Sequence, residues 1–216
     1  MSVSAPDIET ADLGEATRDR VFLAAERLFA RDGFQAVSVR DITAEAGVNL
    51  AAVNYHFGSK DGLLFEIFRH RSAEINRTRA RMLHEATDRA GGKPTVRAIL
   101  EALIAPPVMW MDPAGDRGIA VQFMIRARSE GTEEIKAVLR TDVSALKRFT
   151  DALIAARPDL AAEDVYWRMH FILGVIHQNR SAELERLGIL SGGTADVSDV
   201  AALQARMVDF AVKGFG

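Results

Sequence analysis

The sequence predicts an all-α protein, and three features of its 216 residues support that fold class. Apolar residues recur at spacings of three and four in successive segments, which is the period of amphipathic helices. No segment shows the strong alternation of apolar and polar residues that marks a half-buried strand. Glycine and proline stand at the ends of the periodic segments, where helices stop. We therefore expect a small N-terminal three-helix domain and a larger helical C-terminal domain.

The composition is that of an ordinary globular protein, with 48% apolar and 26% charged residues. No apolar run approaches the roughly 18 residues that a membrane span needs. The first residues are acidic and lack the apolar centre of a signal peptide. The chain has no cysteine, so disulfides and cysteine-ligated metals are excluded. We expect a cytoplasmic protein with no membrane partner.

The N-terminal region divides into an arm and a first helix. Residues 1–15 carry four acidic residues and no basic one, and we expect them to form a disordered arm. The first firm helix is predicted from about Thr17 to Asp32, and Gly33 ends it. Its buried face has the helical period and consists of Val21, Phe22, Ala25, Leu28 and Phe29.

The stretch from Ser38 to Leu64 predicts two short helices joined by a tight turn. Ser38 and Asp41 have the spacing of a capping box, and Gly47 is placed to end the first helix. Asn49 is a favourable N-cap for the second helix, which Gly58 ends. The second helix has an apolar stripe at spacings of three and four, made of Leu50, Val53 and Phe57.

Such a helix pair has the form of a helix-turn-helix, whose second helix lies in the major groove of DNA. A plain helical hairpin gives the same pattern. The second helix, however, carries Asn54, Tyr55 and His56 on its outer side, and its small Ala51-Ala52 pair permits a close approach to DNA. Lys60 stands at the start of the next helix, where an ammonium and free N–H groups can grip a phosphate.

The distribution of charge agrees with DNA binding, although the whole chain has a net charge of −3. Residues 16–81 hold 11 Lys and Arg against 8 Asp and Glu, whereas residues 82–216 hold 16 against 18. The only positive segment is therefore the one that contains the helix-turn-helix.

This segment resembles the DNA-binding domain of the tetracycline-repressor (TetR) family of transcriptional regulators over about residues 17 to 68. The resemblance lies in VFLAAERLFARDGFQAVSVRDIT, then AEAGV, then VNYHF, and then Lys60 and Leu63-Leu64. One departure is Asn54, where the family usually has tyrosine, which affects the base preference. The resemblance implies a DNA-binding domain over residues 16–62 and an effector-binding and dimerisation domain over residues 63–216. The DNA contacts expected from it are Arg40, Thr43, Asn49, Ala51, Asn54, Tyr55, His56 and Lys60.

The C-terminal half is predicted to be helical throughout. Residues 60–85 form a linking helix, and its arginines are interspersed with acids as on a solvated surface. The next helix, 95–105, is expected to end at Pro106-Pro107. A long helix then opens at Thr132 and continues past Leu153. The remaining helices are expected at 116–129, about 161–180 and about 197–213.

Helix 161–180 is apolar around more of its circumference than a one-sided surface helix needs. The pattern suits either a central core helix of a monomer or a helix at an oligomer interface. In TetR-like proteins the last two long helices pair with their copies, which implies a homodimer here. Two recognition helices about one DNA turn apart then read a near-palindromic double-stranded operator.

The family resemblance also implies a site for a small-molecule effector in the C-terminal domain, and repression released by that effector. An apolar wall with few polar groups suits a hydrophobic effector. The segments EALIAPPVMW and YWRMHFILG resemble the fatty-acid-responsive branch of the family, which implies an acyl-type ligand. Core packing is the competing interpretation of the same residues. The candidate effector contacts are Leu103, Met109, Trp110, Phe123, Met124, Arg126, His170, Phe171, His177 and Gln178.

Two other classes of protein compete with a regulator, namely an all-α enzyme and a helical dimeric adaptor. The sequence has no HExxH, no GxSxG and no glycine-rich phosphate loop. His170 and His177 lie about two turns apart, but no carboxylate pattern joins them as metal ligands. We therefore expect no catalytic residue, no metal and no cofactor. The cap of the third helix by Lys60 argues against the adaptor.

Overall fold

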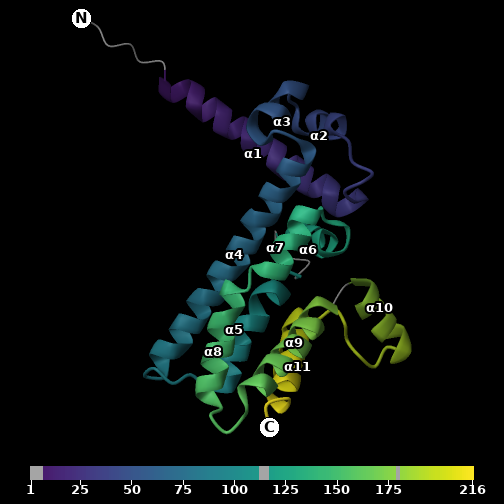
Figure 1. Ribbon diagram of the computed structural model, residues 1–216. Helices are drawn as coiled ribbons and strands as arrows, with labels where there is room; N and C mark the ends of the chain where they lie inside the picture. Colours follow the sequence, from purple (N-terminus) through teal and green to yellow (C-terminus); the bar gives the residue numbers. More distant parts are fainter. Residues whose placement is uncertain (1–6, 112–116, 179–180) are drawn as a thin grey trace, which may run out of the picture. The chain divides into compact units, whose positions relative to one another are not determined.

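The computed structural model of the protein describes residues 7–111, 117–178 and 181–216 (Figure 1). All regular structure in these residues is helical, which confirms the all-α fold class. Contacts divide the chain into two compact units. Unit 1 comprises the residues up to Arg71 together with Gln122–Leu139, and unit 2 comprises Ser72–Val121 together with Arg140–Gly216.

Unit 1 is built on helix α1 (Asp7–Asp32), which packs against α2 (Val39–Ala46) and α3 (Leu50–Phe57). Helices α1, α2 and α3 are the predicted three-helix domain, and the first part of α4 (Lys60–Arg89) adds Leu63, Leu64, Ile67 and Phe68 to its core. Each of these four helices contributes side chains with no exposed surface to the core of the unit, including Val21, Phe29, Ile42, Val53, Leu63 and Ile67.

The predicted disordered arm is partly wrong, because α1 already begins at Asp7. Residues 7–15 form the N-terminal part of the same helix as residues 16–32. Only residues 1–6 of the arm lie outside the described residues. Helix propagation adds one hydrogen bond per residue once a helix is anchored. Acidic residues at an N-terminal end also interact favourably with the helix dipole. An acidic segment next to a firmly packed helix therefore continues it.

Unit 1 also contains a segment from far along the sequence. Gln122–Leu139 contributes the end of α6 (Gly118–Glu130) and most of α7 (Glu133–Thr141). Phe123, in α6, has no exposed surface, and its ring lies 5.5 Å from that of Phe34 and 6.4 Å from that of Phe29. The contacts thus divide the chain differently from the expected boundary between residues 62 and 63, since residues 63–71 and 122–139 belong with the helix-turn-helix.

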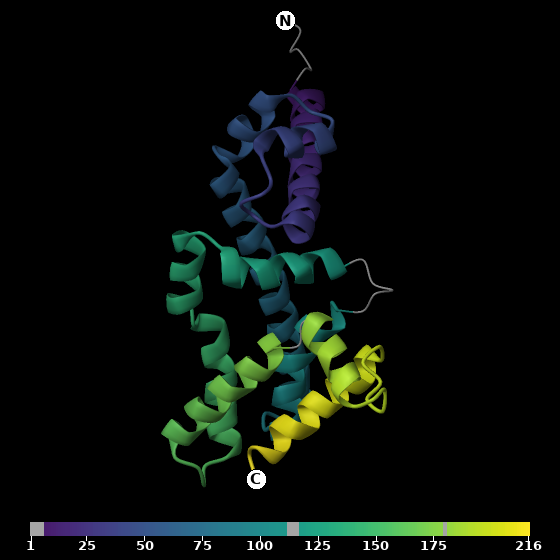
Figure 2. The same cartoon turned by 90° about the vertical axis from the view of Figure 1, so that its right-hand side faces the viewer.

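Unit 2 consists of the rest of α4 with α5 (Val96–Met109), α8 (Ser144–Ala156), α9 (Ala162–Gln178), α10 (Ser181–Leu190) and α11 (Val200–Lys213) (Figure 2). Helix α11 packs extensively against α5, and α8 packs against both α5 and α9. The buried residues come from all of these packed helices and include Ile99, Leu100, Phe149, Leu153, Val165, Met207 and Phe215.

Helix α5 runs through Pro106 and Pro107 to Met109, so the predicted stop at these prolines is wrong. Pro107 has no N–H, and the Leu103 carbonyl one turn earlier therefore lacks its usual helical donor. The Arg79 guanidinium of α4 supplies the missing donor, with Nε donating to the Leu103 oxygen at 2.9 Å. A contact between helices thus stabilises a carbonyl that local sequence leaves without a partner.

Two other expected elements also differ from the structure. The single long helix from Thr132 past Leu153 is two helices, α7 and α8, because Asp142 and Val143 interrupt it. The Asp142 carboxylate accepts hydrogen bonds from the Ser144 hydroxyl at 2.7 Å and the Ser144 N–H at 3.4 Å, which starts α8 afresh. Helix α10 lies between the predicted helices 161–180 and 197–213, where the sequence pattern predicts no helix.

Two kinds of feature are missing from the part of the chain that the structure describes. No helix there combines the length and the apolar character that crossing a bilayer requires. No group of three or more His, Asp or Glu side chains there is arranged to hold a metal ion.

Candidate nucleic-acid interface

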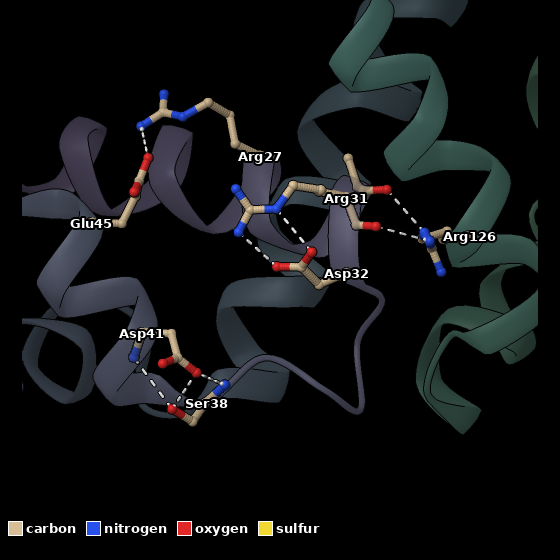
Figure 3. Close-up of polar contacts among 8 residues, drawn as sticks. Arg27, Arg31, Asp32, Ser38, Asp41, Glu45 and Arg126 are labelled. Atoms are coloured by element: carbon tan, nitrogen blue, oxygen red, sulfur yellow. Dashed lines mark hydrogen bonds and ion pairs between the residues drawn. The ribbon is translucent and has the colours of Figure 1, made fainter.

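Helix α2 begins with the capping box that Ser38 and Asp41 predict (Figure 3). The Asp41 carboxylate accepts from the Ser38 hydroxyl at 2.6 Å and from the Ser38 N–H at 2.8 Å. Both hydrogen bonds lower the pKa of the Asp41 carboxyl, and the one from the hydroxyl has the larger effect. Gly47 ends the helix at a φ of 63°, and its N–H donates to the carbonyls of Thr43 and Ala44. Only glycine adopts this left-handed conformation without strain, so the turn between α2 and α3 is set locally.

Helix α3 begins at Asn49 and is held to the unit by Val53. The Asn49 side-chain oxygen accepts from the Ala52 N–H at 3.0 Å, as expected of an N-cap. Val53 has no exposed surface and belongs to the core of unit 1. Asn49 therefore positions the helix, and its predicted contact with DNA remains a proposal.

The opposite side of α3 is an exposed face made of residues at positions i, i+1, i+4 and i+5. Tyr55 is 85% exposed, and the Asn54 amide has no hydrogen-bond partner among the described residues. Leu50, a member of the predicted apolar stripe, is 50% exposed; it is the first residue of the helix and lies at the edge of that stripe. We call this surface the α3 face, and its members are Leu50, Ala51, Asn54 and Tyr55.

His56 lies beside the α3 face rather than on it. Its half-buried ring makes an edge contact with the Tyr55 ring at 4.9 Å and lies 6.2 Å from the Phe57 ring. The Arg18 guanidinium of α1 covers the Phe57 ring at 5.3 Å, which holds this end of α3 against α1. His56 thus supports the exposed Tyr55 ring.

The two residues of α2 expected to contact phosphates differ in accessibility. Arg40 is exposed, and its guanidinium has no partner among the described residues. Thr43 is only 7% exposed, and its hydroxyl donates to the Arg40 carbonyl at 3.1 Å. The phosphate contact of Thr43 therefore stays a prediction, and in this structure its hydroxyl donates within the helix.

The Lys60 ammonium is engaged within the protein. It donates to the carbonyls of Phe34 at 2.9 Å and Val37 at 3.1 Å, in the loop between α1 and α2. An ammonium has three donors, so two of the three directions are occupied. Lys60 therefore ties the start of α4 to the loop that precedes the helix-turn-helix, and at most one donor is left for a phosphate.

Replacing Lys60 by alanine is expected to lower the free energy of unfolding by about 1–3 kcal/mol, because two partly buried carbonyls lose a charged donor. Urea unfolding followed by circular dichroism measures the loss. Lys136→Ala is the matched control, since Lys136 in the same unit forms only an exposed pair with Glu133, a type worth about 0.2–0.5 kcal/mol. Equal losses in the two variants would show that the Lys60 contacts are not stabilising.

Three of the predicted effector contacts lie in unit 1, together with the helix-turn-helix. Phe123 is a core residue, and Met124 packs against the same core. The Arg126 guanidinium donates to the carbonyls of Ala30 at 2.9 Å and Arg31 at 3.1 Å, at the end of α1 (Figure 3). These contacts satisfy carbonyls that a helix end leaves without donors, and the effector contact of Arg126 stays a prediction.

The remaining candidates belong to unit 2 and do not form one cluster. Leu103 is fully buried, and Trp110 is 5% exposed beside Ile75 and Ala120. Met109, one residue away, is 58% exposed. On α9, His170, Phe171 and Gln178 are exposed and His177 is half-buried. The ten predicted effector contacts thus come from both units and differ in exposure, and their contact with an effector stays a prediction.

Comparison with protein families gives two matches along the chain. The family described as bacterial regulatory proteins, tetR family, matches residues 22–67, which contain the helix-turn-helix. The family described as the tetracyclin repressor-like C-terminal domain matches residues 101–214. The second match alone covers more than half of the 216 residues.

Individual relatives agree with these matches. The chain is 30% identical over 78 residues to the HTH-type transcriptional repressor NicS of Pseudomonas putida, which is 36% of this chain and 37% of that repressor. It is 32% identical over 109 residues to the HTH-type nicotine-responsive transcriptional repressor HdnoR of Paenarthrobacter nicotinovorans, which is 50% of this chain and 52% of that repressor. The chain thus aligns with about a third to a half of the length of these relatives.

The fold is also that of solved regulators. The fatty acid degradation regulator FadR from Bacillus halodurans superposes with a TM-score of 0.62 at 16% identity, over 92% of this chain and 95% of that chain. An identity this low shows a shared fold alone. The family matches cover both the helix-turn-helix and most of the C-terminal half, and from them the chain belongs to the TetR family of DNA-binding transcriptional regulators.

Proposed function

We propose that this protein is a homodimeric repressor that places the α3 face in the major groove of a near-palindromic operator. The repressor dissociates from the operator when a small hydrophobic effector binds. The observation that carries the proposal is the α3 face itself. It presents Asn54 and Tyr55 to solvent on a helix whose other side is packed into the unit. Repression is the sign proposed, since NicS and HdnoR are both described as repressors.

Each exposed residue of the interface has a proposed role. The free amide of Asn54 suits a bidentate contact with the N6 and N7 atoms of adenine. The small side chain of Ala51 lets the helix backbone lie close to the base edges. Arg40 is proposed to contact a phosphate, and the third donor of Lys60 is a second candidate for one.

The dimer is proposed to form through the outer face of α9. The inner face of α9 packs into unit 2 through Val165, Met169, Ile172 and Ile176. The outer face carries stacked rings, with Trp167 and Phe171 55% and 62% exposed and their centroids 6.1 Å apart. Gly174 follows on that face, and no atom lies within 4 Å of where its Cβ would be. Exposed aromatic rings beside a glycine favour close packing of a second helix.

The exposed Phe210 of α11 supports the same proposal. This residue is 66% exposed, whereas its neighbours Met207 and Ala211 are buried in unit 2. A second copy that covers both Phe210 and the outer face of α9 buries the aromatic rings that unit 2 leaves in water. Two-fold symmetry then presents two α3 faces, one for each half-site of the operator. A near-palindromic operator with half-sites about 34 Å apart matches this symmetry.

Release by an effector is proposed as a shift between two states of the dimer. An effector changes DNA affinity only through its different affinities for these states, and couplings of about 1–3 kcal/mol are typical. Helices α4 and α6 each continue from one unit into the other, so they are the proposed carriers of the shift. The proposed effector is small and apolar, with an acyl chain as the first class to test. Decanoic acid and palmitoyl coenzyme A are the probes, and a loss of operator affinity with either one supports the class.

Selection of bound fragments from a random DNA pool tests the proposed function at near-physiological salt. Recovery of one near-palindromic motif supports a dimeric sequence-specific regulator. If no motif is enriched, the selection is repeated after unfolding and refolding the protein to remove any bound ligand. A second failure would rule out sequence-specific binding by the α3 face.

Replacing Asn54 by alanine is expected to weaken binding to the selected motif by about 1–3 kcal/mol and to relax the preference at one base pair in each half-site. The reason is that a bidentate contact to adenine is lost while the phosphate contacts remain. Fluorescence anisotropy with operators substituted at each position measures the change. A uniform loss on all sequences would instead assign Asn54 a role in docking.

Replacing Phe171 by glutamate is expected to convert the dimer into a monomer, because two carboxylates would be buried against apolar rings at the two-fold axis. Sedimentation velocity at micromolar concentration measures the oligomeric state. Met109→Glu is the matched control, since Met109 is similarly exposed in the same unit but lies on α5. A Phe171→Glu variant that remains dimeric would move the interface away from α9.

A further inference from the structure

Leu50 combines a large apolar side chain with an exposed position that its own unit does not cover. It is 50% exposed and does not belong to the apolar core of unit 1. An exposed leucine by itself is ordinary on a protein surface. Leu50, however, is the first residue of α3, and the N-terminal residues of a recognition helix are those that contact base edges.

We propose that Leu50 reads the C5-methyl group of a thymine in each operator half-site, an inference that rests on the proposed function. In the major groove the thymine methyl is the apolar feature among otherwise polar base edges. Leucine has no donor or acceptor, so a contact with another base edge would leave the polar groups of that base without water or a partner. A methyl group is therefore the partner that suits Leu50.

The position of Leu50 relative to Asn54 predicts where this thymine lies. The two residues are four apart on the α3 face, which is about 6 Å along a helix axis. Base pairs are stacked about 3.4 Å apart, so this separation spans about two base-pair steps. The thymine is therefore expected within two base pairs of the adenine that Asn54 contacts.

The test replaces single thymines of the selected operator by deoxyuridine, which removes the methyl group and retains base pairing. For the wild-type protein, loss of one methyl contact at the proposed position is expected to weaken binding by about fourfold per half-site. For Leu50→Ala, which shortens the side chain, the same replacement is expected to have no effect. Leu50→Met keeps a long apolar side chain and is expected to retain the sensitivity.

Leu23→Ala is the matched control, because Leu23 is 46% exposed in the same unit but lies on α1. This variant is expected to show the wild-type pattern of deoxyuridine sensitivity. Circular dichroism checks that each variant folds. We expect both alanine variants to fold, because the replaced leucines are exposed.

The outcomes separate this inference from the proposed function. Equal deoxyuridine sensitivity in the wild type and Leu50→Ala, with operator binding intact, would overturn the role of Leu50 alone. The same follows if no thymine within two base pairs of the Asn54-dependent position responds to loss of its methyl group. Absence of any sequence-specific binding by the wild type overturns the proposed function, and the role of Leu50 with it.

Discussion

Replacing Glu26 by alanine is expected to lower the free energy of unfolding by about 3–5 kcal/mol, because it breaks a largely buried ion pair. The Glu26 carboxylate is 4% exposed and accepts two hydrogen bonds from the Arg71 guanidinium, at 2.6 Å from Nε and 2.7 Å from Nη2. The same guanidinium lies 5.7 Å from the Phe22 ring centroid. The pair joins α1 to α4 inside unit 1, so its loss is expected to loosen the unit that carries the α3 face.

Urea unfolding at fixed protein concentration measures this effect, with Glu45→Ala as the control. Glu45 also pairs with an arginine of α1, Arg27, at 3.2 Å, but both side chains are more than 40% exposed. Exposed pairs of this kind contribute about 0–1 kcal/mol. A double replacement, Glu26→Leu with Arg71→Met, is expected to recover most of the stability, because apolar side chains then replace both members of the buried ion pair. A loss in Glu26→Ala no larger than in Glu45→Ala would contradict the assigned role.

Replacing Phe123 by alanine is expected to lower the free energy of unfolding by about 3–5 kcal/mol, as for other buried phenylalanines. Phe123 has no exposed surface and is in contact with Phe29 and Phe34 in the core of unit 1. The substitution leaves a cavity where α6 meets the helices of the DNA-binding unit. Phe123 packs in the core of unit 1, which also carries the α3 face. We therefore expect operator binding and the free energy of unfolding to fall together.

Met109→Ala is the control for Phe123→Ala, since the sequence pattern predicts an effector contact for both residues. Met109 is 58% exposed, and its loss is expected to change stability by less than about 0.5 kcal/mol. Thermal and urea unfolding of the two variants measure the difference. A Phe123→Ala protein with wild-type stability and an altered response to an effector would restore the ligand-contact role.

Contacts of Arg126 and Glu130 explain why part of α6 belongs with the DNA-binding unit. Arg126 donates to two carbonyls at the end of α1, and the two side chains also pair with each other at 2.7 Å. The second carboxylate oxygen of Glu130 accepts from the Phe34 N–H at 3.2 Å. Gly33 lies under this pair at a φ of 89°, and a Cβ there would be 2.9 Å from a Glu130 oxygen. The backbone conformation therefore favours glycine here, and a Cβ would also require the ends of the Glu130 and Arg126 side chains to shift.

The sequence alone determined the features that depend on neighbouring residues. The capping box of Ser38 and Asp41, the stop at Gly47 and the N-cap Asn49 all form hydrogen bonds or turns within a few residues. Such features follow from local backbone chemistry, and the structure has them where the pattern predicts. The all-α fold class and the TetR family were predicted from the same helical periods and motifs, and both are confirmed.

The tertiary structure decided which of the predicted site residues are free to contact DNA or a ligand. Lys60 donates to carbonyls 26 and 23 residues away, and Arg126 donates to carbonyls 96 and 95 residues away. Leu50 has the spacing of a core residue and is nevertheless exposed. A helical period shows which residues share a face, but the packing of distant segments decides whether that face is covered. For this reason the sequence determined the helix-turn-helix, and only the assembled unit decided which of its side chains remain available.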